Sequence, residues 1–489
     1  MRNFILILCL LIAFVGCKNP FKGTPKDNLP PETHTVVDTI IRIGGDRFHS
    51  QVTINWWGDD ADGFVSGFEF TFDTILNSST QWTYTAKSDS DFLLATPFGQ
   101  DTADFTFWVR AIDNNGVKDP TPAHLKYPVK NSPPTIQFLS GANNPLQTFP
   151  VVKFYFQATD PDGIENLNHI EAVWNDSANA TYTFDILTNA ATFEATDLSI
   201  TNPDCKVYSN NSLTELPTLM NGMMLNDTNV LYIRAVDDAG ATSKFVGSYK
   251  IFIKQPHSNL LLVDGYGNGN NTIENFYVSN LLSIGMSAFD TLKIFQQTAG
   301  SYSQLAPDNL TQSRIFKMFD KIIWFSNDAA SSLSLGQRCL NDFFNNNGKL
   351  LMSCYVNSIF DQQSNFLDFT PAQSLIVLQD STLLLADTST VFSAGAPYPD
   401  LKCTQYIGVV RPFNLAVGAT DLYNANLIAK DNNTLTTGPW GGVSTVIARK
   451  QNSNGHTNFV MSTLELQKLD GNGNVHSLLG EVLLNEFNW

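Results

Sequence analysis

Two related stretches, Val109-Arg-Ala-Ile-Asp-Asn-Asn-Gly116 and Ile233-Arg-Ala-Val-Asp-Asp-Ala-Gly240, decide the fold of the first half of this 489-residue chain. In each stretch an apolar strand runs into a turn that is rich in Asp or Asn and ends on glycine. Aspartate favours such a turn because its carboxylate accepts hydrogen bonds from the nearby backbone, and glycine tolerates the positive φ that the turn requires. The repetition predicts two copies of one β-module in tandem.

Other repeated elements support the same interpretation. Trp57-Gly-Asp-Asp-Ala-Asp-Gly-Phe64 corresponds to Gln157-Ala-Thr-Asp-Pro-Asp-Gly-Ile164, and a second Pro-Pro pair at Pro133-Pro134 precedes the second copy. Short runs such as Gly67-Phe-Glu-Phe-Thr-Phe72 alternate apolar and polar residues, which is typical of strands that are buried on one face. The first half of the chain is therefore expected to be all-β.

The Arg-Ala-x-Asp-x-x-Gly hairpins, the strand tryptophan Trp56 and the Gly67-Phe-Glu-Phe70 strand resemble those of fibronectin type III and related immunoglobulin-like modules of bacterial surface proteins. The resemblance implies one β-sandwich over residues 32–131 and a second, longer one over residues 132–256.

The aspartates of the repeated turns are candidate calcium ligands: Asp60, Asp62, Asp113, Asp160, Asp162 and Asp237. If both turns lie at one end of their sandwich, three carboxylates meet in each copy, and such a density of oxygen ligands can hold Ca²⁺ in extracellular modules. Ordinary turn formation explains the same residues. We favour the turn interpretation and keep calcium as the alternative; no other cofactor is expected.

The sequence pattern changes after Gln255. The continuous apolar run 259–264 is followed by a glycine-rich turn, a helix from Asn271 to near Gly285 and a second strand at 291–295. Continuous apolar strands that alternate with helices predict a parallel sheet covered on both faces. The same pattern continues with strands at 321–325, 349–354 and 459–463 and with helices at 335–345 and 475–487.

The runs Leu-Leu-Val-Asp-Gly-Tyr-Gly, Phe-Asp-Lys-Ile-Ile-Trp-Phe-Ser and Asn-Gly-Lys-Leu-Leu-Met-Ser, at 261–267, 319–326 and 347–353, resemble those of class I glutamine-amidotransferase-like, flavodoxin-like domains. The resemblance implies a doubly wound α/β domain over residues 257–489. Active members of that family carry a nucleophilic cysteine between glycines and a histidine in a His-x-Glu pair.

The catalytic pattern of that family is incomplete in this chain. Cys354 follows Met352-Ser353 without flanking glycines, and neither His456 nor His476, the histidines after Leu260, has the His-x-Glu spacing. We therefore favour no catalytic residue; Cys354 with His456 or His476 is the candidate set of an enzymatic alternative. Because ligands of open α/β sheets bind at the carboxyl ends of the strands, Asp264 and Tyr266 are expected to line the ligand crevice.

The first seventeen residues are typical of an export signal. Arg2 precedes an apolar run from Phe4 to Val15, which is too short to span a bilayer. Phe14-Val15-Gly16-Cys17 resembles a bacterial lipobox, which implies that residues 1–16 are removed and that Cys17 carries lipid. Residues 17–31, with four prolines, are expected to form an extended tether. An ordinary signal peptide with a chance cysteine is the alternative.

Composition narrows the classes of partner. The chain has 46 acidic and 29 basic residues, a net charge of −17, and no cluster of Lys or Arg, which argues against a nucleic-acid partner. The cysteines that remain after Cys17 have no paired spacing that predicts a metal site or a disulfide framework. Asp-Ser/Thr followed by an apolar residue or Thr resembles the O-glycosylation pattern of exported Bacteroidota proteins, and it recurs at Asp38, Asp73, Asp101, Asp176, Asp290 and Asp380.

Together these patterns predict a cell-envelope lipoprotein, anchored to the outer membrane through Cys17, that binds an envelope protein or glycan without catalysis. The first alternative is an envelope hydrolase of amide or glycan-related substrates with Cys354 as its nucleophile. The second is a purely structural component of an envelope assembly.

Overall fold

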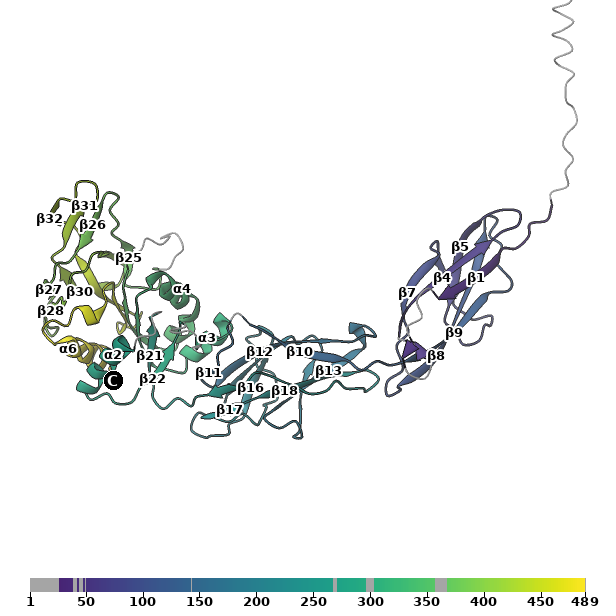
Figure 1. Ribbon diagram of the computed structural model, residues 1–489, viewed down its shortest axis with the longest axis horizontal. Helices are drawn as coiled ribbons and strands as arrows, with labels where there is room; N and C mark the ends of the chain where they lie inside the picture. Colours follow the sequence, from purple (N-terminus) through teal and green to yellow (C-terminus); the bar gives the residue numbers. More distant parts are fainter. Residues whose placement is uncertain are drawn as a thin grey trace, which may run out of the picture. The chain divides into compact units, whose positions relative to one another are not determined.

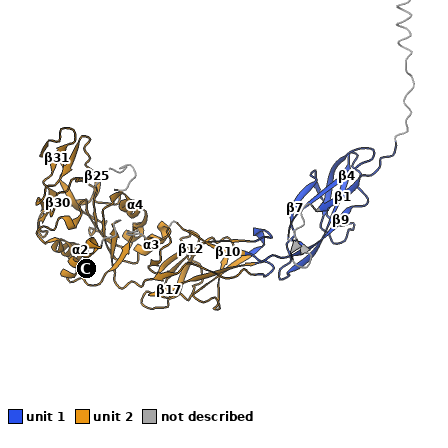
Figure 2. Cartoon of the chain, in the orientation of Figure 1, with its two compact units in different colours: residues 1–134, 160–167, 237–241 blue, residues 135–159, 168–236, 242–489 orange. Residues whose placement is uncertain are grey.

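The computed structural model describes residues 26–37, 42–43, 47–48, 50–141, 143–266, 271–295, 303–356 and 367–488. The export signal and Cys17 lie outside these residues. The chain divides into two compact units (Figure 2). Unit 1 comprises Met1–Pro134, Asp160–Leu167 and Asp237–Ala241, and unit 2 comprises Thr135–Thr159, Asn168–Val236 and Thr242–Trp489. The domain boundaries drawn from the sequence stay a prediction.

Unit 1 contains a β-sandwich made of two sheets (Figure 1). One sheet has the order β1 (Glu32–Val37), β4 (Gln51–Asp59), β7 (Asp89–Leu93). The other has the order β2 (Arg42–Ile43), β3 (Arg47–Phe48), β9 (Ala123–Lys130), β8 (Thr102–Asp113), β5 (Val65–Thr71), β6 (Thr83–Thr85).

The core of this first sandwich follows from the alternation of its strands. Ile54 and Trp56 of β4 pack against Phe107 and Val109 of β8, and all four side chains are buried. Trp57, the next residue after Trp56, points to the outer face and is 48% exposed. The β-sandwich predicted for the first copy is confirmed.

The second sandwich is built from three sheets. The first has the order β10 (Thr135–Leu139), β12 (Val151–Thr159), β15 (Ala190–Ala195), β16 (Cys205–Ser209). The second has the order β14 (Tyr182–Asp185), β13 (Leu167–Trp174), β18 (Leu231–Asp237), β19 (Val246–Gly247). The third has the order β11 (Gln147–Thr148), β20 (Ile251–Ile253), β17 (Asp227–Asn229). Trp174 on β13 packs against Phe154 on β12 and Phe193 on β15, which closes the core between two of the sheets. The second predicted β-sandwich is thereby also observed.

Each sandwich contains an ion pair between neighbouring strands at the equivalent position, as expected for copies of one module. Arg110 on β8 pairs with Glu69 on β5 at 2.8 Å, and Arg234 on β18 pairs with Glu171 on β13. Burial alone would raise the pKa of each glutamate, but the hydrogen bonds and positive charges of Lys118 and Arg110 at Glu69, and of Arg234 at Glu171, outweigh burial and hold both pKa values below the usual range. Both arginines occupy the same position in the repeated sequence.

The remainder of unit 2 is organised around a nine-stranded sheet (Figure 1). Its first five strands are parallel and have the order β22 (Asp290–Lys293), β21 (Leu260–Gly265), β23 (Lys321–Ser326), β24 (Lys349–Cys354), β34 (Thr457–Ser462). In chain order this is 2-1-3-4-5. Its α-helices among the described residues are α2 (Thr272–Ser283), α3 (Asn309–Phe316), α4 (Ala329–Cys339), α5 (Asn341–Asn345) and α6 (Val475–Gly480), which continues as the π-helical turn η4 (Glu481–Glu486).

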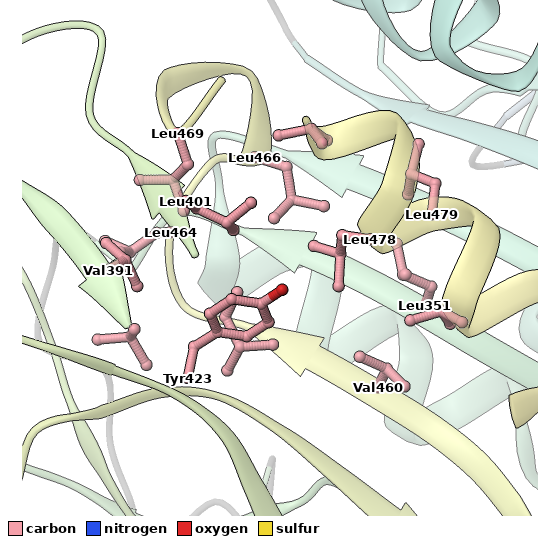
Figure 3. Packing of buried hydrophobic residues seen from close by; sticks show 14 of the residues in the cluster. Leu351, Val391, Leu401, Tyr423, Val460, Leu464, Leu466, Leu469, Leu478 and Leu479 are labelled. Atoms are coloured by element: carbon pink, nitrogen blue, oxygen red, sulfur yellow. The ribbon is translucent and has the colours of Figure 1, made fainter. Parts of the chain in front are cut away.

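Both faces of the parallel strands are covered, which explains their continuous apolar sequences. Leu260 and Leu262 of β21 belong to a core with residues of α2 and α6, whereas Leu261 and Val263 belong to a core with residues of α3, α4 and α5. Figure 3 shows part of the first core, where Leu478 and Leu479 lie over the sheet. The strands predicted at 259–264, 321–325, 349–354 and 459–463 are present, and each end lies within two residues of its predicted position.

The region 372–451 was not assigned from the sequence, and it is mostly antiparallel β-structure. Strands β33 (Thr445–Gln451), β30 (Ala419–Ala425), β27 (Thr390–Ser393) and β28 (Leu401–Lys402) extend the large sheet beyond β34. Two small sheets accompany them, β25 (Ala372–Leu375) with β29 (Phe413–Leu415), and β26 (Ser381–Leu384), β31 (Ile428–Asp431), β32 (Thr437–Pro439).

Two helix predictions need correction. The single helix expected at 335–345 is two helices, α4 and α5, which meet at Leu340. The closing helix changes to π-helical geometry after Gly480. None of the helices among the described residues has the length and apolar character to span a membrane.

Candidate functional site

Cys354 lies at the carboxyl end of β24, an interior strand of the large sheet, where a catalytic thiol was considered. Its side chain is 0% exposed and belongs to the core beneath α3, α4 and α5. Burial raises the pKa of the thiol to about 12; the hydroxyls of Ser332 and Ser326, which bond to it, lower the pKa too little to offset burial. A buried thiol that stays protonated at neutral pH is a poor nucleophile.

Neither of the two candidate histidines is hydrogen-bonded to Cys354 in the described part of the chain. His456 lies in the turn before β34, and β34 pairs in parallel with β24 so that Ser462 is level with Ser353. At about 3.3 Å per strand residue, His456 is roughly 20 Å from the level of Cys354, at the opposite end of the strands. His476, on α6, has its Nε2 atom 3.2 Å from the hydroxyl of Ser477. Among the described residues, no histidine is hydrogen-bonded to Cys354.

Asp264 and Tyr266 lie at the carboxyl end of β21, as expected, but both side chains are buried. The carboxylate of Asp264 accepts a hydrogen bond of 2.9 Å from the backbone N–H of Tyr266. This bond holds the turn that follows the strand. Within the described part of the chain, the two side chains predicted to line the crevice are therefore packed inside the domain.

Tyr266 belongs to a buried polar cluster that sequence reasoning missed. Its hydroxyl donates a hydrogen bond to Glu465, which is 4% exposed, and accepts one of 2.6 Å from the amide of Gln467. Lys468 pairs with the second carboxylate oxygen of Glu465. Burial, and then the charge of Glu465, raise the pKa of Tyr266, so the phenol remains a donor at physiological pH. The cluster joins the loop after β34 to the turn after β21.

The only sequence signal for this cluster is the position of its residues relative to the last parallel strand. Glu465 and Gln467 follow the last parallel strand at its carboxyl end, where polar residues of α/β sheets gather. In the structure the carboxylate is already paired with a phenol, an amide and an ammonium group. The cluster is suited to holding two loops together, and it leaves no unpaired base for catalysis within the described residues.

The aspartates of the repeated turns secure the segment that leads into each sandwich. In the second copy, Asp237 accepts a hydrogen bond of 2.6 Å from the side-chain amide of Asn131, and Asp162 accepts one of 2.5 Å from the backbone N–H of Ser132. All four residues belong to unit 1. Pro133-Pro134 follows immediately, so the entry to the second sandwich is fixed by two carboxylates.

The first copy repeats this arrangement at its own Pro-Pro pair. Asp113 accepts a hydrogen bond from the side-chain amide of Asn28, and Asp62 accepts one of 3.2 Å from the backbone N–H of Leu29. Asn-x-Pro-Pro therefore precedes both sandwiches, at 28–31 and 131–134. This shared motif was not recognised in the sequence.

The remaining two aspartates form the turns themselves. Asp160 accepts a hydrogen bond of 2.7 Å from the backbone N–H of Asp162, and Asp60 accepts one of 3.3 Å from the N–H of Asp62. The geometry supports the turn interpretation for Asp60, Asp113, Asp160 and Asp237, whose carboxylates accept hydrogen bonds from the backbone of their own turns. Within the described ranges, no group of three or more His, Cys, Asp or Glu side chains is arranged to hold a metal ion. Calcium binding stays an untested alternative.

Asp160 differs from the other turn aspartates in its environment. One of its carboxylate oxygens, Oδ2, is buried without a hydrogen-bond partner. Burial, and then the negative charges of Asp162 and Asp237, raise the pKa of Asp160 to about 6, although the N–H of Asp162 opposes the shift. The ionised turn therefore carries an electrostatic cost near neutral pH.

Within unit 2, the second sandwich is joined to the α/β region by buried charges. Lys153 on β12 is 0% exposed, and its ammonium group lies 2.7 Å from the carboxylate of Asp308, which caps helix α3. Arg314 on α3 pairs with Glu194 on β15 at 2.7 Å, and its guanidinium stacks on the ring of Tyr208. The sandwich therefore contacts the α/β region through specific, largely buried ion pairs as well as apolar packing.

Comparison with known proteins gives only a partial match. No family model and no curated protein matches the chain. Among solved structures, it is similar to the fibronectin(III)-like modules of Clostridium thermocellum CbhA, with 14% identity over 45% of this chain and 95% of that chain and a TM-score of 0.16.

Two chicken proteins give similar values. The interferon gamma receptor alpha chain matches with 10% identity over 46% of this chain and 98% of its own, with a TM-score of 0.19. The FN1–FN3 domains of CNTN1 match with 9% identity over 46% of this chain and 99% of their own, with a TM-score of 0.15. At these scores, the sandwich architecture rests on the strand pairing described above.

Proposed function

We propose that the protein is a lipoprotein of the cell envelope that presents its C-terminal region for binding and does not catalyse a reaction. In this proposal, acylated Cys17 anchors the chain to the outer membrane, residues 18–31 act as a tether, and the two sandwiches are spacers. The partner is an envelope protein or glycan. The lipobox-like sequence before Cys17 and the tandem sandwiches support this organisation.

The observation that carries the proposal is the environment of Cys354. The position that would hold the nucleophile of an amidotransferase-like enzyme is occupied by a fully buried thiol with a raised pKa and without an imidazole partner among the described residues. Nucleophilic catalysis by cysteine needs a thiolate that substrate can reach and an adjacent base. Binding requires neither.

We further propose that the α/β region is a flavodoxin-like domain of the amidotransferase-like class. The parallel strand order 2-1-3-4-5, with helices on both faces, supports this assignment. The antiparallel extension beyond β34 is an addition to that framework. Because fold does not determine activity, the assignment is compatible with a domain that binds without turnover.

Thiol labelling tests this proposal against the hydrolase alternative. In a variant that keeps Cys354 but replaces Cys205, Cys339 and Cys403 with alanine, we expect labelling by a maleimide at pH 7.5 to be at least about a hundredfold slower in the native state than in guanidinium. Ser79→Cys, at an exposed loop position, is the control for reagent access. Labelling of native Cys354 at a rate close to that of the control would contradict the proposal and favour the hydrolase alternative.

A further inference from the structure

A groove of about 650 Å³ lies in the antiparallel region 372–451, which is an addition to the parallel sheet. It is lined by residues that precede and begin β31, by the edge strand β32 and by the residue after β32: Asn426, Leu427, Ile428, Thr437, Gly438, Pro439 and Trp440. A volume of this size is within the range of about 300–1,000 Å³ that small-ligand sites occupy.

Trp440 is held in a fixed orientation beside the groove. Its indole N–H donates a hydrogen bond of 2.9 Å to the carbonyl of Val443, and its backbone N–H donates one of 2.9 Å to the carbonyl of Leu427. A Cβ atom at Gly442 would lie 2.3 Å from the indole ring, so only glycine allows the backbone to approach the ring this closely. The ring is therefore positioned before any ligand arrives, which lowers the entropic cost of binding.

The groove combines apolar surface with uncharged polar groups. Pro439 and the partly exposed Trp440 ring provide most of the apolar part, because Leu427 is only 3% exposed, whereas the amide of Asn426 and the hydroxyl of Thr437 are on exposed residues. No Asp, Glu, Lys or Arg lines it. Burying a charged ligand group without a counter-charge is costly, so the lining favours a neutral ligand with both apolar and hydrogen-bonding surfaces.

A peptide strand fits this groove less well. β32 is the edge of its small sheet, but it is only three residues long and ends with Pro439, which has no backbone N–H. Short edges that contain proline resist the addition of another strand. A pyranose ring, in contrast, has an apolar face that stacks on an aromatic ring and equatorial hydroxyls that bond to amide and hydroxyl groups.

We propose that this groove is a binding site for a neutral saccharide, with Trp440 as the stacking platform and Asn426 and Thr437 as hydrogen-bonding groups. This inference rests on the proposed binding function and names its ligand class. It also gives the antiparallel region 372–451 a role, because residues of this region line the groove.

Calorimetric titration of the detergent-solubilised full chain tests the proposal. The probes are cellotetraose and N,N′,N″,N‴-tetraacetylchitotetraose as neutral saccharides, tri-galacturonic acid as a charged one, and an alternating nine-residue peptide as a strand mimic. We expect one of the neutral saccharides to bind, and Trp440→Ala to weaken that binding by about tenfold or more through loss of stacking. Asn426→Ala should weaken it about threefold.

Two further variants keep the result interpretable. Trp440→Phe is the variant to use if Trp440→Ala proves unstable, because it retains an aromatic ring that packs against the core. It should bind the saccharide with an affinity between those of the natural chain and Trp440→Ala. Trp57→Ala removes an exposed tryptophan of unit 1 and should leave the affinity unchanged. Failure of both neutral saccharides to bind, binding of only the charged saccharide or the peptide, or equal binding by Trp440→Ala would overturn the proposal. Saccharide binding that survives Trp440→Ala would leave the binding function standing at another site.

Discussion

The ammonium group of Lys153 and the carboxylate of Asp308 lie 2.7 Å apart and join the second sandwich to the first turn of helix α3. Lys153 is fully buried, and its other acceptor is the side-chain oxygen of Asn211, also at 2.7 Å. Burial alone would raise the pKa of Asp308, but the hydrogen bonds from Lys153 and from the N–H of Thr311 outweigh it and hold that pKa below its usual range. The ionised pair therefore depends on both partners.

Replacement of Asp308 by asparagine should destabilise unit 2. The variant leaves the Lys153 charge buried among neutral acceptors only, which costs about 3 kcal/mol in comparable buried pairs. Differential scanning calorimetry should show a lower midpoint for the transition of unit 2. The matched control is Glu215→Gln, which removes the partner of the half-exposed Lys206 and should cost less than about 1 kcal/mol. Equal effects of the two variants would contradict the role of the buried pair.

The raised pKa of Asp160 predicts how the stability of unit 1 depends on pH. Because its pKa is raised to about 6 in the folded state, the folded chain binds this proton more tightly than the unfolded chain does. Unit 1 should therefore gain stability as the pH falls from 7.5 to about 5. Asp160→Asn should stabilise unit 1 by about 1 kcal/mol at pH 7.5, after allowance for solvent screening, and should abolish this gain.

The same calorimetric series distinguishes the turn from a calcium site. If the aspartates act as turn formers, millimolar Ca²⁺ leaves the transition of unit 1 unchanged in both the natural chain and Asp160→Asn. A rise in the midpoint with Ca²⁺ that Asp160→Asn removes would establish the calcium alternative and contradict the turn interpretation.

The two Asn-x-Pro-Pro motifs should differ in their energetic weight. Asn131 and Asp237 are both buried, so Asn131→Ala leaves a carboxylate oxygen without its amide partner and should cost about 2 kcal/mol. Asn28 is partly exposed, and water can replace its amide at Asp113, so Asn28→Ala should cost less than about 1 kcal/mol. Denaturant titration of both variants provides the comparison; a larger loss at Asn28 would refute it.

The hydroxyl of Tyr266 should matter for stability. Tyr266→Phe removes the donor to buried Glu465 and should destabilise unit 2 by about 2 kcal/mol. Tyr127 provides a control, because its hydroxyl is buried without a hydrogen-bond partner, so Tyr127→Phe should leave stability unchanged or raise it. Thermal unfolding of the two variants measures both effects. A neutral Tyr266→Phe would show that Gln467 and Lys468 satisfy the carboxylate on their own.

Local sequence predicted the elements whose burial pattern is regular. The alternation along β4 places Ile54 and Trp56 in the core, and the continuous run 349–354 coincides with β24, because that strand is covered on both faces. The strands of the parallel sheet and both β-sandwiches follow from such patterns, whereas the order of the parallel strands is known only from the structure. The region 372–451 escaped prediction because its strands are short and rich in polar residues, and neighbouring strands supply its packing.

The candidate sites depend on contacts between distant parts of the chain, which no local pattern reveals. Tyr266 and Glu465 are 199 residues apart, and Tyr155 reaches Asp308 across 153 residues. The sequence placed Cys354 correctly at a strand end, but its burial follows from the helices that cover the sheet. The pairing of β24 with β34 likewise decides that His456 lies at the opposite end of the strands.

Anchoring through lipid is the central claim of the proposed function, and intact-mass analysis of the protein purified from the membranes of the cells that make it is its most direct test. We predict a polypeptide that begins at Cys17 and carries the mass of its acyl chains, and a Cys17→Ser variant that leaves the membrane fraction. A chain that begins at Met1, or one that carries no lipid and stays in the aqueous phase, would contradict the claim.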